Sequence, residues 1–276
     1  MSDAVFRAVA GPPPGAPRPN QAPAPATPGS VPPGAPLPGQ PLPPRERADS
    51  VRLKGVSKTY GNGKEALIDI DLVIPEGDFI FLVGPSGAGK STLIKLLVRD
   101  EKASAGRVEV AGHDLGHMKK REVPLLRRRI GIVFQDFRLL PRKTVHENVA
   151  FALEVTGTPK RRMQPAVERA LALVGLTEQA RQRPDQLSGG EQQRTAIARA
   201  MVHDPRLIIA DEPTGNLDPL ISWEIIQLLL RINEMGTTVM MATHDAEVVT
   251  ALRRRVVALE DGRVVRDEVG GYHREY

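Results

Sequence analysis

The most constraining feature of the sequence is the segment Gly84-Pro-Ser-Gly-Ala-Gly-Lys-Ser91, which matches the pattern G-x-x-x-x-G-K-[S/T]. Phe79–Val83 before it predicts a buried strand, and residues 92–98 after it predict a helix. The alternative is a chance match in a glycine-rich turn, and the strand and helix patterns on either side of the motif argue against it. Glycines let successive backbone N–H groups curve around phosphate oxygens at a helix N-terminus, and the lysine adds positive charge. The sequence therefore predicts a phosphate-binding loop (P-loop) that binds ATP through Gly84, Pro85, Ser86, Gly87, Ala88, Gly89, Lys90, Ser91 and Thr92.

An acidic pair follows the apolar run at residues 207–210. Asp211 and Glu212 would stand at the C-terminal end of a buried strand, which is the edge of a parallel sheet where ligands bind. There Asp211 would hold Mg²⁺ together with the hydroxyl of Ser91, and Glu212 would face the terminal phosphate and activate water. The alternative is an exposed acidic turn. A P-loop in the same chain favours the catalytic interpretation.

Strand-like and helical patterns alternate along most of the chain, which predicts an α/β fold with parallel βα units. Residues 51–56 and 68–74 predict antiparallel strands at the start of the domain, and Asp261-Gly262 predicts a type I′ turn in a closing hairpin. Residues 144–187 show no strand pattern and predict a helical insert. The other predicted strands are Ile130–Phe134, 207–210 and Thr238–Ala242, and the other predicted helices are Val145–Val155, 165–174, 191–203 and 220–234.

The first 48 residues differ in composition from the rest of the chain. Fifteen of the 25 prolines precede residue 45, interleaved with glycine, alanine and glutamine. A segment with so few large apolar side chains cannot form a core, so residues 1–48 predict a disordered, partly polyproline-II tail. Such a tail is either a solvated extension or a ligand for a proline-binding domain. The folded domain is predicted at residues 49–276.

Composition excludes several classes of protein. The absence of cysteine excludes disulfides and thiolate metal sites. No apolar run approaches the ~18 residues of a membrane helix, and we expect no secretory signal. The net charge of +5 allows nucleic acid, anionic lipid or a phosphate-rich ligand as partner. Basic clusters at residues 119–121, 127–129, 160–162 and 253–255 lack interleaved aromatic residues, so they indicate solvated faces or lipid contacts and no nucleic acid is expected.

The segment Leu187-Ser-Gly-Gly-Glu-Gln-Gln-Arg194 resembles the LSGGQ signature of ABC-type ATPases, with Glu191 in place of the signature glutamine. A serine and two glycines precede a predicted helix, so this segment is a second potential anion site. The resemblance covers about residues 51–265. It implies a homodimer that holds two ATP molecules, each between the P-loop of one subunit and the signature of the other. The residues implied to act in trans are Ser188, Gly189, Gly190, Glu191 and Asp218.

Three further residues match motifs of the same family. Tyr60 resembles the aromatic residue that stacks on adenine, Gln135 resembles the Q-loop glutamine, and His244 resembles the switch histidine that contacts the γ-phosphate. The family implies a P-loop NTPase fold of ABC type, with a parallel core sheet, an N-terminal antiparallel β-subdomain and a helical subdomain at residues 136–187. It also implies that the catalytic residues are Glu212, His244 and Gln135. The Mg²⁺ ligands that it implies are Ser91, Gln135 and Asp211.

Two longer stretches resemble particular subgroups of the family. Residues 210–218 resemble the lipoprotein-releasing, macrolide-exporting and cell-division ATPases, and residues 135–153 resemble the cell-division members, the FtsE family, more specifically. This implies a polytopic, FtsX-like membrane subunit, a place at the cytoplasmic face of the cell membrane, and control of cell-wall hydrolysis at the septum. The alternatives are an exporter or lipoprotein-release ATPase and, from another class, an ABC protein acting on nucleic acid. The chain lacks the long coiled-coil insert or second cassette typical of that last class.

Overall fold

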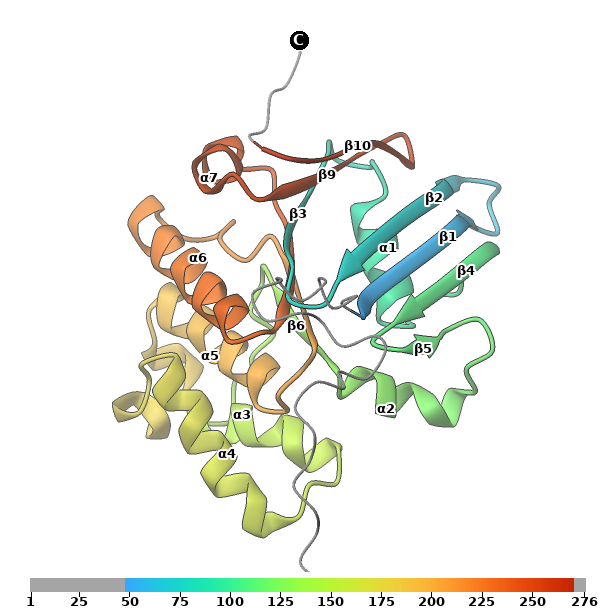
Figure 1. Ribbon diagram of the computed structural model, residues 1–276. Coiled ribbons are helices and arrows are strands. Elements are labelled where there is room, and N and C mark those ends of the chain that lie inside the picture. The colour runs from blue at the N-terminus through green and yellow to red at the C-terminus, as the bar shows by residue number, and fades with distance from the viewer. Residues whose placement is uncertain (1–47, 271–276) are drawn as a thin grey trace, which may run out of the picture. The chain divides into compact units, whose positions relative to one another are not determined.

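The computed structural model describes residues 48–270. Their central feature is a six-stranded sheet in the order β10-β9-β3-β8-β7-β6 (Figure 1). Five strands run parallel, and β10 pairs antiparallel with β9 at the edge. The strands are β3 (Phe79–Val83), β6 (Ile130–Phe134), β7 (Leu207–Asp211), β8 (Thr238–Ala242), β9 (Arg255–Glu260) and β10 (Arg263–Val269).

Strand β3 shows how the sheet divides two cores. Its five residues are all buried, as expected for a strand covered on both faces. Because successive side chains alternate between faces, Ile80 and Leu82 join one apolar cluster, whereas Phe79, Phe81 and Val83 join the other. The strand therefore lies between two packed layers, and the loop that follows it emerges at the edge of both.

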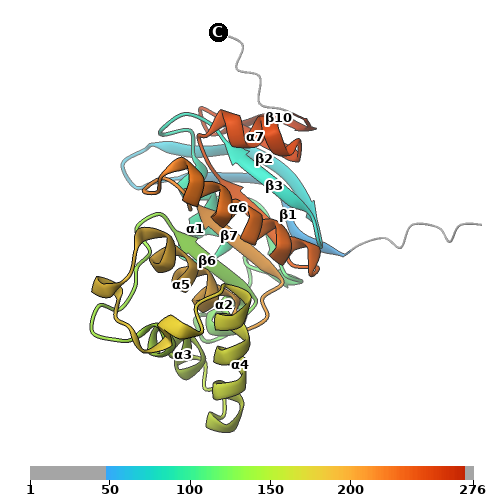
Figure 2. The ribbon, with the colours of Figure 1, turned by 90° about the vertical axis from the view of Figure 1, so that its left-hand side faces the viewer.

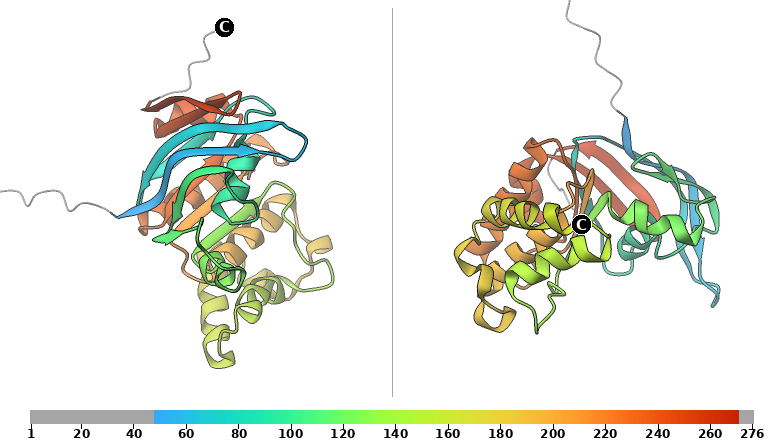
Figure 3. Two further views of the ribbon diagram at one scale, coloured as in Figure 1. Left: turned by 90° about the vertical axis from the view of Figure 1, so that its right-hand side faces the viewer. Right: turned by 90° about the horizontal axis from the view of Figure 1, so that it is seen from below.

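The first layer contains a second, antiparallel sheet and one helix. The sheet has the order β2-β1-β4-β5, with β1 (Asp49–Thr59), β2 (Glu65–Pro75), β4 (Ala105–Val110) and β5 (His113–Asp114). Helix α1 (Lys90–Leu97) contributes Leu93 and Leu97 to the apolar cluster shared with this sheet. The left view of Figure 3 faces the antiparallel sheet, with α1 behind it. The P-loop is thus followed by a helix that is fixed between two sheets.

The second layer is helical and covers the opposite face of the main sheet, as Figure 2 shows for α5 and α6. Its apolar cluster joins residues of α3, α4, α5, α6 and α7 to the sheet. The helices are α3 (Val145–Val155), α4 (Lys160–Leu173), α5 (Gly189–Met201), α6 (Pro219–Glu234) and α7 (Ala246–Leu252), and the short α2 (Val123–Arg127) packs beside β6. None of the helices between residues 48 and 270 is long and apolar enough to cross a membrane.

The predicted α/β class, antiparallel N-terminal strands and helical insert are confirmed. Residues 144–187 form helices and no strand, and the closing turn has the predicted positive φ at Asp261 (45°) and Gly262 (76°). The prediction for α4 was wrong at its start, because the helix begins at Lys160 and includes Pro165. Strands β4 and β5 and helices α2 and α7 were not predicted. The predicted tail lies outside the described residues except for Ala48.

Candidate nucleotide-binding site

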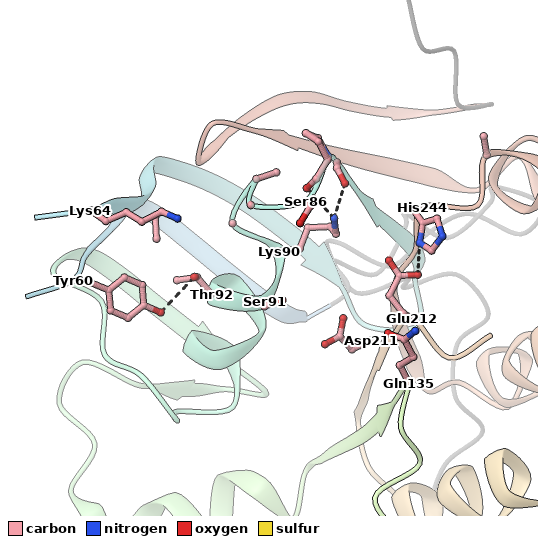
Figure 4. A pocket seen from close by; sticks show the side chains of 17 residues that line it. Tyr60, Lys64, Ser86, Lys90, Ser91, Thr92, Gln135, Asp211, Glu212 and His244 are labelled. Atoms are coloured by element: carbon pink, nitrogen blue, oxygen red, sulfur yellow. Dashed lines mark hydrogen bonds and ion pairs between the residues drawn. The ribbon is translucent and has the colours of Figure 1, made fainter. Parts of the chain in front are cut away.

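A cleft of about 1030 Å³ opens where β3, β6, β7 and β8 end (Figure 4). The whole P-loop lines it, together with residues that follow the other strands and residues from the turn between β1 and β2. The lining residues are Tyr60, Lys64, Ala66, Gly84, Pro85, Ser86, Gly87, Ala88, Gly89, Lys90, Ser91, Thr92, Gln135, Asp211, Glu212, His244 and Ala246. The fold therefore brings together every residue that was expected to bind or hydrolyse ATP within one subunit.

The P-loop has a backbone that requires glycine. Gly89 precedes α1 with a φ of 110°, and a Cβ atom there would lie 2.6 Å from the carbonyl oxygen of Ala66. Lys90 folds back over the loop, where its Nζ donates to the carbonyl oxygens of Gly84 (2.5 Å) and Pro85 (3.2 Å). Ser91 occupies the first turn of α1 and also lines the cleft. Positive charge and helix N–H groups thus converge on one concave surface.

The acidic pair sits opposite this loop, at the end of β7. Glu212 has a left-handed backbone (φ 49°), and its Oε2 lies 2.9 Å from Nδ1 of His244. The pKa of Asp211 is raised above its ordinary value, mainly by burial and then by the neighbouring charge of Glu212, while Lys90 and Arg138 oppose the rise. Two adjacent carboxylates in a half-buried position favour a cationic ligand beside them.

Gln135 connects two segments of the cleft. Its backbone carbonyl accepts a hydrogen bond from Nδ2 of Asn216 (3.0 Å), and its side-chain amide donates to Oδ1 of the same residue (3.4 Å). Gly215 leaves room for this contact, because a Cβ atom there would lie 2.7 Å from the amide nitrogen of Gln135. The residue after β6 is therefore linked to the segment that follows the acidic pair.

The residues expected to act in trans do not line the cleft of their own chain. Ser188 is the N-cap of α5, and its hydroxyl oxygen accepts a hydrogen bond from the backbone N–H of Glu191 (3.3 Å). In return, Oε2 of Glu191 accepts from the backbone N–H and the hydroxyl of Ser188, both at 2.8 Å. Asp218 caps α6 by accepting from the N–H of Ile221 (3.0 Å). Within one subunit these residues serve as helix caps.

Comparison with known proteins agrees with this geometry. Residues 67–215 match the family model described as ABC transporter. The chain is 54% identical to the cell division ATP-binding protein FtsE of Streptococcus pneumoniae over 221 residues, which are 80% of this chain and 96% of that protein. The chain belongs to the ABC transporter family of ATP-binding proteins. It is an ABC-type ATPase, as the resemblance implied.

Other relatives of this ABC ATPase support the same assignment. The FtsE protein of Bacillus subtilis is 53% identical over 226 residues, covering 82% of this chain and 99% of that one. A solved ATP-binding cassette, a dimer in a post-hydrolysis state bound to ADP and Pi, matches with a TM-score of 0.71 and 38% identity. This match covers 79% of the present chain and 98% of the cassette. The predicted ABC fold is thus confirmed.

Three residues of the ABC cleft were missed from the sequence. Lys64 and Ala66 follow Tyr60 in the β1–β2 turn and the start of β2, and Ala246 opens α7. A lysine four residues after Tyr60, directly after the turn Gly61-Asn62-Gly63, was a usable signal for a cation that lines the cleft. The two alanines had none, because their place in the cleft depends only on how distant segments pack.

Proposed function

We propose that this ABC ATPase is the ATP-hydrolysing subunit of a cell-division complex, driving a polytopic, FtsX-like membrane subunit that controls cell-wall hydrolysis at the septum. The observation that carries the proposal is the near-complete coverage of FtsE proteins, 96–99% of their length at 53–54% identity. In the proposed complex the subunit lies at the cytoplasmic face of the membrane, bound there through its partner. The cleft described above supplies the ATPase chemistry on which this role depends.

Within one subunit, different cleft residues bind the base of ATP, bind its phosphates and activate the attacking water. Tyr60 stacks on the adenine ring, and the P-loop N–H groups with Lys90 hold the β- and γ-phosphates. Glu212 accepts a proton from the attacking water, since its carboxylate lines the cleft and can act as a general base. His244 hydrogen-bonds to Glu212 and so fixes the direction of that carboxylate. Gln135 orients the water with an uncharged amide that does not repel the phosphate.

The donor set fits a Mg²⁺ ion that arrives with ATP. Ser91, Gln135 and Asp211 present oxygen atoms from three different elements to one cleft, and Mg²⁺ prefers oxygen ligands and substrate phosphates. Within residues 48–270 no group of three or more acidic or histidine side chains could hold a metal by itself. These three residues would therefore complete a coordination shell formed largely by phosphate and water. The ion would neutralise charge that develops on the phosphate oxygens.

The signature residues are proposed to complete the cleft of a second subunit in a homodimer. Ser188, Gly189, Gly190 and Glu191 lie at the N-terminus of α5, outside the cleft of their own chain. A helix N-terminus offers N–H donors to an anion. The dimeric state of the solved ATP-binding cassette supports this arrangement. Asp218, at the start of α6, would contact the partner from the adjoining segment.

The segment after Gln135 is the proposed contact with the membrane subunit. Phe137, Leu139 and Leu140 are half-buried, and none belongs to the buried core. The segment has a defined shape, because Nη1 of Arg199 donates to the carbonyl of Arg138 (2.6 Å) and Asn148 bonds both the N–H and the carbonyl of Leu140. Movement of Gln135 on ATP binding would therefore shift an apolar patch (Phe137, Leu139 and Leu140) as a unit.

Co-purification with the membrane subunit tests this contact. Leu140→Glu is expected to reduce capture of the FtsX-like subunit about tenfold while ATP binding stays at the wild-type level, because a charge would be buried in the interface. Val155→Glu is the matched control, since Val155 is an exposed apolar residue of the same helical region (64% exposed). Equal capture by both variants would place the contact elsewhere.

The division role is tested in the bacterium that carries this chain. Expression of Glu212→Gln, which is expected to bind ATP without turnover, should block septation and give filamentous cells. Glu234→Gln, at the exposed C-terminal end of α6, is the control and should divide normally. Normal septa combined with a defect in export or lipoprotein release would contradict the proposal and favour a transport role.

A further inference from the structure

Lys58 is a buried lysine beside the nucleotide cleft. It belongs to β1, it is only 9% exposed, and it does not line the cleft itself. Its Nζ lies 4.9 Å from the centroid of the Tyr60 ring. A lysine is rarely buried unless its charge is paired, so the surroundings of Lys58 must stabilise the ammonium at this position.

Two acceptors hold the Lys58 ammonium in place. Nζ donates to Oε2 of Glu101 (2.8 Å) and to the backbone carbonyl of Lys102 (3.0 Å). The hydrogen bond to Lys58 is the main reason why the pKa of Glu101 is lowered, so the Glu101 carboxylate that accepts from Lys58 is ionised at neutral pH. Glu101 is itself fixed to the end of α1, because its backbone N–H donates to the carbonyl of Lys95 (3.1 Å).

Tyr60 is connected to both ends of α1. Its hydroxyl lies 3.4 Å from Oγ1 of Thr92 in the first turn of the helix, as Figure 4 shows. Its ring reaches Glu101, beyond the other end of the helix, through Lys58. Next to this link, Thr59 and Ser104 exchange hydrogen bonds between the same two segments of the chain. The aromatic ring therefore has a fixed position relative to the helix that follows the P-loop.

From these contacts we infer that Lys58, held by Glu101, is a positioning residue for base recognition: it fixes the Tyr60 ring and strengthens its stacking on the nucleotide base. The inference rests on the proposed nucleotide site. A cation near an aromatic ring holds the ring by electrostatic attraction. It also withdraws electron density from the ring, which favours stacking on an electron-rich purine. The effect concerns only the base, because Lys58 lies outside the part of the cleft that binds phosphates.

Binding of ATP and of inorganic triphosphate, measured side by side on the full chain with Mg²⁺, tests this inference. Lys58→Met is expected to weaken ATP binding about 5- to 20-fold and to leave triphosphate binding unchanged, since only the base contact is lost. The same loss should raise KM for ATP without lowering kcat. Lys58→Arg should recover most of the affinity for ATP. Lys54→Met, an exposed lysine on the same strand, is the matched control and should bind both ligands like the wild type.

Glu101→Gln is a second variant that tests the same inference if Lys58→Met does not fold. It leaves the lysine in place but removes the charge that holds it, so a smaller loss for ATP alone is expected. An equal loss of ATP and triphosphate binding in these variants would overturn the inference and assign the pair a purely structural role. Unchanged ATP binding would overturn it as well. Failure of the wild type to bind either ligand would instead contradict the proposed nucleotide site.

Discussion

Two helix N-termini carry the most recognisable motifs of this chain, and they are built in opposite ways. Helix α1 begins after Gly89, which is left-handed and provides no side-chain cap. Helix α5 begins after Ser188, which forms a reciprocal capping box with Glu191. The first helix presents its N–H groups to a large cleft, whereas the second satisfies part of its own N–H groups.

The difference indicates which end binds a phosphate in a single subunit. At α1 the N–H groups need an external acceptor, and Lys90 adds a positive charge beside them. At α5 a carboxylate from the same chain already occupies the positive end of the helix. The N-terminus of α5 is therefore stable without a nucleotide of its own chain, and a nucleotide bound by a partner subunit can reach it. Four substitutions test this difference between the two helix ends.

Removing the charge at α1 is expected to have the largest effect. Lys90→Ala should weaken ATP binding about 100-fold or more, because a charge-assisted contact to phosphate is lost in a partly desolvated cleft. Titration with a fluorescent ATP analogue measures this. Lys95→Ala, an exposed lysine in the last turn of the same helix, should bind ATP normally. Normal affinity in Lys90→Ala would mean that α1 is not the phosphate site.

Blocking the α5 end should separate binding from turnover. Ser188→Arg is expected to keep ATP affinity within about twofold and to lower turnover by about 100-fold, because a large side chain prevents the loop from reaching the nucleotide of the partner. The same change should abolish the ATP-dependent dimer that Glu212→Gln accumulates, as measured by sedimentation. If Ser188→Arg loses ATP affinity as severely as Lys90→Ala, the loop acts on its own chain.

The charge of the Glu191 carboxylate at the N-terminus of α5 should contribute to the free energy of unfolding. Hydrogen bonds from Ser188 lower the pKa of Glu191, so the charged cap stabilises the folded state above the unfolded pKa and is lost as the pH falls through the folded pKa. Glu191→Gln keeps the shape of the box and should cost about 0.5–1 kcal/mol at pH 7. Urea denaturation checks this. The difference from wild type should shrink below about pH 4, and a constant difference would contradict the charge-based explanation.

The carboxylate that faces α1 should behave in the opposite way. Burial raises the pKa of Asp211, so its charged form costs stability at neutral pH, and that cost is relieved as the pH falls through the folded pKa. Asp211→Asn should stabilise the nucleotide-free protein by about 0.5 kcal/mol, a small amount because solvent screens a half-buried group. It should also impair turnover. Destabilisation without ligand would show that Asp211 has a structural partner.

The sequence predicts local features of the site well and distant ones poorly. The P-loop follows from residues that are adjacent in the chain, so its spacing and the strand and helix patterns beside it identify it. The bond between Gln135 and Asn216 joins residues far apart in sequence, and no local pattern predicts it. The role of Lys58 was missed for the same reason, since an alternating strand pattern gives no sign that its ammonium lies near the Tyr60 ring.

Missed elements of the fold also have physical causes. Strand β4 starts with Ala105 and Gly106, which have weak strand propensity, and Gly106 is needed because a side chain there would overlap the backbone of Gly55. Helix α4 was predicted to start at Pro165, yet it extends back to Lys160, and Met163 in the added turn packs against the core. In both cases tertiary contacts outweigh local preference.

The most direct test of the composite site mixes two inactive variants, Lys90→Ala and Ser188→Arg, in equal amounts and measures ATP hydrolysis. A mixed dimer would pair the intact P-loop of one subunit with the intact signature of the other, which restores one of its two sites. Since half of the dimers are mixed, about a quarter of wild-type activity is expected from the two-fold arrangement. Activity in the mixture that stays at the background of the separate variants would contradict a site shared between two subunits.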